Sequence, residues 1–370
     1  MPSTGRCRRL QISGTLHPVR WTIAAALLVP IAVATGSLLA KYAGQNDLAR
    51  TLFRTLRYLF AAEVLLLFIA ASIGFVYESS ARDRDAKLYC PPGKLVDIGA
   101  HRLHISCTGQ GSPTVVLEYG HQASYLDWYL VQPEIARFSR VCSYDRAGYG
   151  WSDLSPAPRV PSVMAEEMHT LLRAAGEAPP YILVGHSFGS FDAVMFAHKF
   201  PNEVAGVVLV DGSHPDAVRP FLLREKVWLR VMQFTMPFGL PRWRLWCGGA
   251  VSGIKQAITC RSSVYQAIYR EWLAFPQSAD EVRTITSLGN IPLIVIARDP
   301  AVRGNSPAEM RWNQLQRQYL RLSPNSEFLI AAGSGHDVPL AKPDIVVNAV
   351  RKLHAHRASS REPAGIQEIP

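Results

Sequence analysis

The chain has 370 residues, 48% of them hydrophobic and 18% charged, which excludes disordered and fibrous proteins and leaves room for one large domain with appendages. The formal net charge of +10 suits an anionic membrane surface or nucleic acid. No lysine- or arginine-rich block lies near a helix or strand that could contact the bases of a nucleic acid. Nucleic acid is therefore not expected as a partner.

Two long apolar runs follow a basic N-terminal tail, residues 1–20. The first, 21–40, has no charged residue, and the second, 58–77, carries only Glu63. Twenty helical residues rise about 30 Å, the thickness of the hydrocarbon core of a bilayer. The sequence therefore predicts a transmembrane hairpin over 21–77, a multi-pass membrane protein and the lipid bilayer as a partner. The alternative is a signal peptide followed by a buried helix.

The side of the membrane that holds the main domain stays open. Four basic residues precede the first run, four lie between the runs and four follow the second, so the distribution of positive charge gives no orientation. Cys90 and Cys107 flank a predicted hairpin, and Cys247 and Cys260 form a second possible pair. Free buried cysteines are the alternative to disulfides. The extracytoplasmic side is favoured over the cytoplasmic side.

A linker over 78–92 leads into a region where short apolar runs alternate with helical patterns. Most of these runs are continuous Val, Ile and Leu, which is typical of strands covered on both faces. Alternating strands and helices predict the α/β class, with a mostly parallel sheet and right-handed crossovers. After a leading hairpin ("LVDI" and "RLHIS"), the predicted strands are 114–119, 140–144, 181–185, 205–211, 292–297 and 327–332. The predicted helices are 163–175, 188–199, 307–320 and 344–354.

The core of this domain is predicted to comprise 93–213 and 291–355, followed by a flexible tail, 356–370. Residues 214–290 contain no convincing strand, four tryptophans and many Leu and Phe residues. We interpret them as a helical cap inserted over the carboxyl edge of the sheet, where ligands bind in open α/β folds. Most of the aromatic residues should pack the cap on the core, and a few should line a pocket.

The stretch Gly185-His186-Ser187-Phe188-Gly189 is a G-x-S-x-G motif between a predicted strand and a predicted helix. Glycine at both positions lets the chain make a strained turn that exposes the serine hydroxyl at the edge of the sheet. The helix start adds N–H groups and the positive end of a dipole beside the hydroxyl. Ser187 is therefore the predicted nucleophile.

A serine hydroxyl needs a base to take its proton, and His336 is the candidate. It lies just after the last predicted strand and follows the serine in the chain order Ser, Asp, His. Two acids compete to orient the imidazole: Asp299, after the penultimate strand, is favoured over Asp211, at the end of the strand that follows the nucleophile helix. For each, capping a turn is the ordinary alternative role.

Attack on a carbonyl creates an oxyanion, which needs donors already in place. The N–H of Phe188, one residue beyond the serine, is the first predicted donor. The second should come from the loop after strand 114–119, where Gly120 allows the backbone to approach closely. His121 is preferred there, and Gln122 is the next choice. No metal ligands or cofactor motif are predicted.

The runs "PTVVLEYG", "VCSYDRAGYGWSD", "YILVGHSFGS", "VVLVDGSHPD" and "SGHDVPL" occur in this order. Together they resemble the α/β-hydrolase fold superfamily, and they are most similar to bacterial members with a helical cap, over roughly residues 93–355. The resemblance implies that fold, with Ser187 as nucleophile, His336 as base, and Phe188 and His121 as oxyanion donors.

Two departures from the family pattern bear on the site. The family's acid loop has a glycine three residues before its aspartate, whereas Ala297 stands two before Asp299, which keeps Asp211 open. The family's His-Gly in the oxyanion loop is replaced by Tyr119-Gly120, so the geometry of that loop is not fixed by the resemblance.

The leading functional hypothesis is a membrane-anchored serine hydrolase that cleaves a small apolar or amphiphilic ester, in the manner of a carboxylesterase or lipase. A serine at 187 disfavours epoxide hydrolases and dehalogenases, whose covalent intermediates require a carboxylate nucleophile. The alternatives are a peptidase, thioesterase or acyltransferase with the same triad, and a non-catalytic membrane-tethered binding protein on the same fold.

Overall fold

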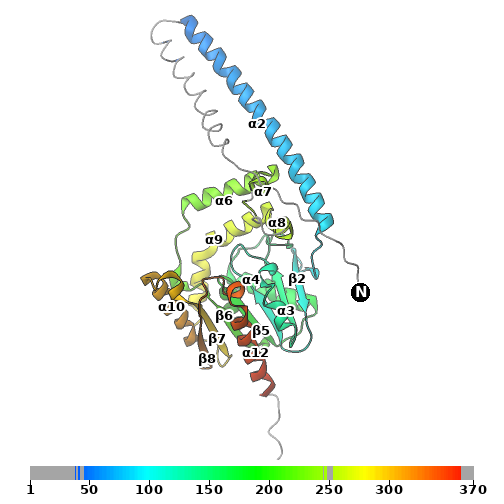
Figure 1. Ribbon diagram of the computed structural model, residues 1–370, viewed down its shortest axis with the longest axis vertical. Coiled ribbons are helices and arrows are strands. Elements are labelled where there is room, and N and C mark those ends of the chain that lie inside the picture. Colours follow the sequence, from blue (N-terminus) through cyan, green and yellow to red (C-terminus); the bar gives the residue numbers. More distant parts are fainter. Residues whose placement is uncertain (1–37, 39–40, 42–45, 245, 248–252, 360–370) are drawn as a thin grey trace, which may run out of the picture. The chain divides into compact units, whose positions relative to one another are not determined.

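The computed structural model describes residues 46–244, 246–247 and 253–359, together with Leu38 and Lys41 (Figure 1). The chain divides into two units, residues 1–76 and 77–370. Helix α2 (Asn46–Leu88) begins in the first unit and ends in the second. Its segment Arg50–Leu88 has 39 residues and reaches a mean hydropathy of 2.4, so by length and composition it is able to cross a membrane.

The predicted transmembrane hairpin is corrected to one candidate span among the described residues. The run 21–40 lies outside the described residues, Leu38 apart, and the run 58–77 lies within α2. A single span does not show a multi-pass topology. Within the predicted linker over 78–92, residues 78–88 are the end of α2.

The extension of α2 has a local cause. Residues 78–88 contain good helix formers, and the Nε of Arg82 donates to the Oε1 of Glu78 over 3.0 Å, one turn away. The helix ends just before Pro91 and Pro92, which lack the N–H that a helix needs.

An eight-stranded sheet forms the centre of the second unit, in the order β1-β2-β4-β3-β5-β6-β7-β8. The β1–β2 and β2–β4 pairs are antiparallel and all other pairs are parallel, which confirms the predicted mostly parallel sheet. The strands are β1 (Lys94–Asp97), β2 (Arg102–Thr108), β3 (Thr114–Glu118), β4 (Val141–Asp145), β5 (Tyr181–His186), β6 (Val204–Val210), β7 (Leu293–Arg298) and β8 (Ser326–Ala331).

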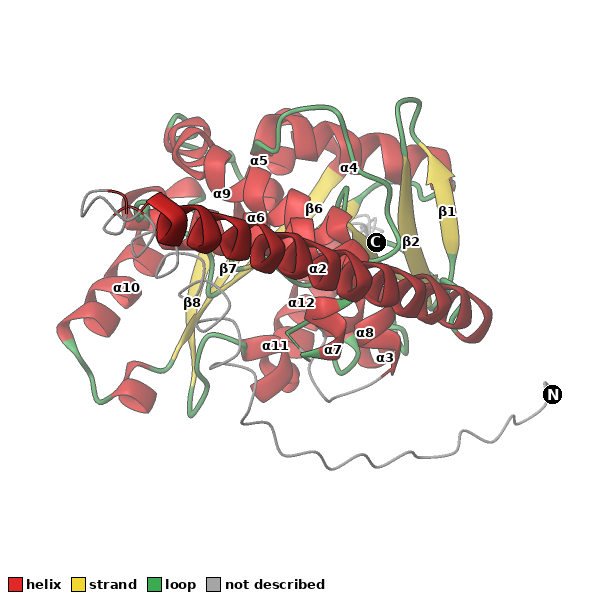
Figure 2. Ribbon diagram, turned by 90° about the horizontal axis from the view of Figure 1, so that it is seen from above, coloured by secondary structure: helices red, strands yellow, loops and turns green. Residues whose placement is uncertain are grey.

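Helices cover both faces of the sheet, as the continuous apolar strands require. Every residue of β3, β4, β5 and β6 is buried. One face packs against α4 (Pro161–Ala175) and α5 (Gly189–Lys199), and the other against α3 (Gln132–Ile135) and α12 (Pro343–Ser359). Figure 2 shows these two helical layers on opposite sides of the strands.

The chain between β6 and β7, predicted to be a cap, is helical in its described residues. Its helices are α6 (Leu223–Thr235), α7 (Leu240–Trp243), α8 (Gly253–Thr259) and α9 (Ser262–Arg283). Leu229 and Met232 of α6 pack with Val264 and Ile268 of α9, and α6 crosses above α9 in Figure 1. Phe275, further along α9, belongs to the core cluster of the sheet, so α9 joins the cap to the core.

The remaining short elements connect these layers. The two further α-helices are α10 (Pro307–Gln318) and α11 (Val338–Ala341). The 3₁₀ turns are η1 (Tyr125–Trp128), η2 (Pro201–Glu203), η3 (Pro215–Ala217), η4 (Met236–Phe238), η5 (Pro300–Arg303) and η6 (Tyr319–Leu322).

Two disulfides brace the second unit. Cys247 pairs with Cys260 within the cap, one of the two pairings considered from the sequence. Cys107 pairs with Cys142 rather than with Cys90, which is exposed and free. The reason is register: Cys107 on β2 lies directly opposite Cys142 on the antiparallel strand β4.

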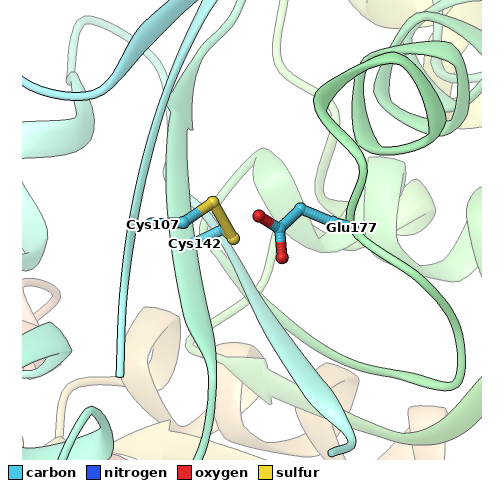
Figure 3. Close-up of side chains that lie close together, drawn as sticks. All are labelled: Cys107, Cys142 and Glu177. Carbon is cyan, nitrogen blue, oxygen red and sulfur yellow. A yellow bond between two sulfur atoms is a disulfide. The ribbon is translucent and has the colours of Figure 1, made fainter. Parts of the chain in front are cut away.

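The carboxylate of Glu177 lies beside the Cys107–Cys142 disulfide (Figure 3). The two cysteine sulfur atoms and the Glu177 carboxylate lie close enough together to resemble a set of metal ligands. The two sulfur atoms are bonded to each other, and the Glu177 carboxylate accepts hydrogen bonds of 3.0 and 2.6 Å from Arg140. Because a metal needs free thiolates and carboxylates as ligands, we interpret this group as a covalent brace with a neighbouring ion pair.

Candidate active site

Ser187 occupies the turn between β5 and α5, in a left-handed conformation with φ of 52°. A Cβ on Gly189 would lie 2.6 Å from the carbonyl oxygen of Glu118, and one on Gly185 would lie 2.6 Å from the carbonyl oxygen of Gly189. Both positions therefore require glycine. A left-handed non-glycine residue costs about 1–3 kcal/mol, which the packed strand and helix on either side offset.

His336 lies in the loop between β8 and α11, with its imidazole against Ser187. Its Nε2 is 3.0 Å from the serine Oγ, and its Nδ1 is 2.5 Å from Oδ2 of Asp211. Since Nδ1 donates to the carboxylate, Nε2 is left free to accept the serine proton. His186, next to the nucleophile, donates from Nε2 to the carbonyl oxygen of His336 over 2.9 Å and so holds the loop in place.

Asp211 is fully buried at the end of β6 and receives four donors on its two carboxylate oxygens. Oδ1 accepts from the backbone N–H of Arg298 at 3.1 Å and from the indole of Trp312 at 2.6 Å. Oδ2 accepts from the Arg298 guanidinium at 3.1 Å as well as from His336. Burial by itself would raise the pKa of Asp211, but the hydrogen bond and charge of His336 and the charge of Arg298 lower it below its ordinary value.

Asp299, the acid that the sequence favours, does not contact His336 in this structure. Its two carboxylate oxygens accept from the backbone N–H groups of Ala301, at 2.9 Å, and Gly333, at 2.8 Å. These two hydrogen bonds lower the pKa of Asp299. Asp299 caps η5 and ties it to the turn after β8, the ordinary role of an aspartate in a turn. Of the two competing acids, the structure brings Asp211 to the histidine.

The loop after β3 passes directly beside the serine. A Cβ on Gly120 would lie 2.7 Å from the Cβ of Ser187, so only glycine leaves room for the hydroxyl. In the described part of the chain, neither Phe188 nor His121 uses its N–H in a hydrogen bond to another backbone group. Gln122, the alternative donor, has φ of 63° and borders a cavity under the cap.

A buried arginine holds this loop from behind. Arg146 donates to the carbonyl oxygens of Tyr119 and Gly120, the latter over 2.9 Å. Because a trans peptide is planar, fixing the carbonyl of Gly120 also fixes the direction of the next N–H, that of His121. The guanidinium donates to Glu118 on β3 as well, so Arg146 connects the loop to the sheet.

Glu271 of the cap helix α9 completes this network. It is fully buried and accepts from Arg146 at 3.0 Å, from the Tyr149 hydroxyl at 2.7 Å and from Nδ1 of His121 at 2.8 Å. Burial would raise the pKa of Glu271, but the Arg146 charge and the His121 hydrogen bond hold it well below the ordinary value. Burial dominates at Glu118, whose pKa rises to about 7 despite Arg146. Of the two carboxylates, Glu271 is the one whose charged form its neighbours favour more strongly.

Two neighbouring cavities lie between the sheet edge and the cap. One, of about 360 Å³, contains Ser187 and His336 and is lined by Phe275, Trp312 and Arg303 among others. The other, of about 440 Å³, lies under α6 and is lined by Phe221, Arg224, Trp228 and Leu229, with Gln122. Arg219 and Trp272 line both. The larger cavity lacks the triad, so we assign the chemistry to the smaller one.

Several residues of the site are not evident from the sequence. Arg146 lies in the run "VCSYDRAGYGWSD", which contributes to the family resemblance but does not single out the arginine. Glu271 is one of five acidic residues in a basic cap, and an acid at an otherwise apolar helix position is the signal that could have revealed it. Trp312 and Arg298, which bind Asp211, carry no signal in the sequence.

Comparison with known sequences gives one family and several relatives. Residues 113–244 match the family model described as alpha/beta hydrolase fold. Two Bacillus subtilis (strain 168) proteins described as uncharacterized, YbdG and YqjL, are each 26% identical, over 187 and 243 residues, or 50% and 65% of this chain. The chain spans 58% of the length of YbdG and 83% of that of YqjL. An uncharacterized vacuolar membrane protein of Saccharomyces cerevisiae is 28% identical over 134 residues, 31% of this chain and 21% of the yeast protein.

Solved structures share the fold. A thermophilic esterase from Thermogutta terrifontis aligns with a TM-score of 0.52 and 23% identity, over 69% of this chain and 94% of the esterase. The epoxide hydrolase CorEH aligns with a TM-score of 0.52 and 18% identity, over 71% of this chain and 98% of its own. At these identities the likeness is one of fold, and it spans different chemistries.

Proposed function

We propose that the chain is a membrane-anchored serine hydrolase of the α/β-hydrolase fold superfamily that cleaves an ester through an acyl-enzyme on Ser187. The match of residues 113–244 to the family model and the fold shared with a solved esterase support this proposal. The observation that carries this proposal is the continuous hydrogen-bonded line from Ser187 through His336 to Asp211. A nucleophile, a base and a group that orients the base are the three roles that acyl transfer requires.

In the proposed first step, Nε2 of His336 takes the proton of the Ser187 hydroxyl as the oxygen attacks the ester carbonyl. Asp211 keeps its negative charge and stabilises the imidazolium. The oxyanion that forms is stabilised by the N–H groups of Phe188 and His121. Loss of one such donor typically reduces transition-state stabilisation by about 3 kcal/mol.

Collapse of this intermediate breaks the bond to the leaving alcohol, and His336 returns the proton to the alcohol oxygen. Water then enters, gives a proton to Nε2 of His336 and attacks the acyl carbonyl. The second intermediate releases the acid and restores the Ser187 hydroxyl. The nucleophile supports this chemistry over that of covalent epoxide hydrolases, because a hydroxyl rather than a carboxylate faces the base.

Membrane anchoring is supported by the apolar segment of α2 and, more distantly, by the resemblance to a vacuolar membrane protein. The two disulfides support an extracytoplasmic catalytic unit, because such bonds persist in oxidising compartments. A reporter fused to the C-terminus tests the side: activity only in the cytoplasm would contradict it.

A fluorophosphonate probe, which reacts with activated serines, tests the central proposal. We expect covalent labelling of the full-length protein in membranes and none of Ser187→Ala. Ser190→Ala is the matched control, because Ser190 is buried three residues further on and donates to the carbonyl of Gly185. Absence of labelling of the folded wild type would overturn the hydrolase proposal in favour of a binding protein.

A panel of esters with graded acyl length would then identify the substrate class. The apolar aromatic lining of the two cavities favours an apolar or amphiphilic acyl chain. We expect kcat/KM to rise with chain length until the cavities are filled. A preference for amide or thioester substrates would assign the same triad to a peptidase or thioesterase.

A further inference from the structure

Helix α6 of the cap is apolar on two faces. On its inner face, Leu229 and Met232 are buried against α9. On its outer face, Leu223 and Phe234 are 76% and 73% exposed, and Val227 and Val231 between them are also exposed. A surface helix of a globular protein ordinarily carries polar residues on its outer face. The ring of Phe234 lies 5.8 Å from that of Phe238, but within the described part of the chain the stripe stays largely uncovered.

The outer stripe has the pattern of a helix that lies on a membrane. At 100° per residue, its four apolar residues fall within an arc of about 80°. Arg224 follows on one side of the arc, and Lys226 and Arg230 lie on the other. Apolar residues flanked by basic ones suit the boundary between acyl chains and anionic headgroups.

Helix α7, which follows α6, adds amphipathic aromatics. Trp243 is 52% exposed, and Trp246, three residues further on, is also half exposed. Tryptophan is enriched at the interface between lipid and water, where its ring is apolar and its N–H finds a partner.

A buried ionic clamp fixes the cap to the end of α2. Arg242 of α7 donates from Nε to Glu78 over 2.9 Å and from a terminal nitrogen to Asp85 over 2.8 Å. The guanidinium and the Glu78 carboxylate are almost completely buried. Glu78 directly follows Tyr77, the last residue of the apolar run 58–77. The cap is therefore bound to the residues at which the candidate span gives way to polar sequence.

From these observations we propose that the outer face of α6 and α7 binds the surface of the lipid bilayer in which α2 is anchored. The inference rests on the anchoring part of the proposed function and goes beyond it, since it assigns the cap a membrane-binding surface. A second copy of the chain or a soluble partner would not account for the clamp at the end of the apolar segment.

The same helix also forms a wall of a cavity. Arg224, Trp228 and Leu229 of α6 line the cavity that adjoins the triad. When α6 lies on the bilayer, this cavity is next to the acyl chains, so an ester substrate passes from the membrane to Ser187 without crossing water. The substrate class that follows is a membrane-resident lipid ester.

The test places an environment-sensitive fluorophore on the outer stripe of the full-length protein. Phe234→Cys is labelled in a Cys7→Ser/Cys90→Ser background and reconstituted into vesicles of phosphatidylcholine with one quarter phosphatidylglycerol. Ile330→Cys on β8, another exposed apolar position, is the matched control. We expect lipids with a quencher in the acyl chain to reduce emission about two-fold or more at 234 and little at 330.

The outcomes separate this inference from the proposed function. Protein that floats with the vesicles but shows equal quenching at the two positions overturns the membrane-binding surface alone. Protein that does not float overturns the anchoring and the inference with it, whereas fluorophosphonate labelling of Ser187 is independent of both results. Emission that is shielded from water but not quenched by lipid identifies a protein partner and also overturns the inference.

A second experiment measures the turnover of the double variant Leu223→Glu/Phe234→Glu. Both positions lie outside the two cavities. We expect turnover of an ester embedded in vesicles to fall about ten-fold, because two charged residues oppose insertion. Turnover of a short water-soluble ester should be unchanged, which shows that the variant is folded. Equal turnover of the embedded ester by wild type and variant would overturn the role of this face.

Discussion

At the catalytic site, two of the unusual residues, Asp211 and Glu271, are charged and buried, and both have several partners within the chain. Asp211 receives four donors, and Glu271 is bound by an arginine, a tyrosine and a histidine. On the outer face of the cap, the unusual residues are apolar and exposed, and the described chain leaves them largely uncovered. The carboxylates of the first region are hydrogen-bonded within the chain, so their positions are fixed as catalysis requires. The apolar side chains of the second region are left exposed, so that region is suited to contact with something outside the chain.

The largest expected effect tests whether Asp211 is the acid of the catalytic triad. Asp211→Asn should lower kcat about 10⁴-fold, because an amide no longer holds the His336 tautomer that accepts the serine proton. Asp299→Asn should change kcat less than about two-fold, because Asp299 only caps a turn. Steady-state kinetics on a soluble ester measure both. Similar losses in the two variants would show that the triad is assigned wrongly.

The next effect concerns the network behind the oxyanion loop. Arg146→Lys should lower kcat about 10- to 100-fold with little change in KM, because lysine cannot hold two carbonyls and a carboxylate at once. Glu271→Gln should also lower kcat with little change in KM, but by a smaller factor. Arg270→Lys is the matched control, since Arg270 also holds loop carbonyls from α9, those of Ser155, Pro156 and Ala157.

These variants separate positioning from folding. A fall in kcat without a change in Tm assigns Arg146 to the orientation of the His121 N–H. If Arg270→Lys loses as much activity as Arg146→Lys, or if the loss appears only in KM, Arg146 has no special role in the site.

A smaller effect distinguishes the cap from the core. The Cys247–Cys260 disulfide closes a loop of 13 residues, and its removal by Cys247→Ala/Cys260→Ala should reduce the free energy of unfolding by about 3 kcal/mol. Limited proteolysis should then cut the cap before the core. Cys90→Ser should leave Tm unchanged, because this cysteine is free and exposed. Equal protease resistance of the double variant would contradict a bracing role.

The smallest effect is a dependence of stability on pH. Burial and the nearby His336 lower the pKa of His186 to about 4, below about 6.5 in the unfolded chain. Between these values the unfolded state binds the extra proton, so stability falls as pH decreases from about 6.5 to 4, by about 2 kcal/mol between pH 7 and pH 5. His186→Gln keeps a donor for the His336 carbonyl and should flatten this dependence in chemical denaturation. An unchanged slope would show that another group titrates.

Local sequence was sufficient for the parts of the molecule that depend on local patterns. Continuous Val, Ile and Leu runs located the six strands after the hairpin to within one residue, because strands buried on both faces need such runs. The turn at Ser187 was predicted because two neighbouring glycines are needed where backbone atoms approach within 2.6 Å of a would-be Cβ.

The rest depended on loop conformation and register, which are not local. Asp211 and Asp299 both follow strands that end at the same edge. Only the backbone of each loop decides which carboxylate reaches His336 and which turns to Ala301 and Gly333. The sequence left the partner of Cys107 open, and Cys142 was not among the candidates, because β4, the neighbour of β2 on its other side, begins more than thirty residues later.

The four donors around Asp211 also have a consequence for work in acid. Its carboxylate stays ionised to a lower pH than that of an ordinary aspartate, because those donors lower its pKa. The negative charge that orients the imidazole should therefore persist in mild acid. A loss of turnover under those conditions should not be ascribed to protonation of the aspartate.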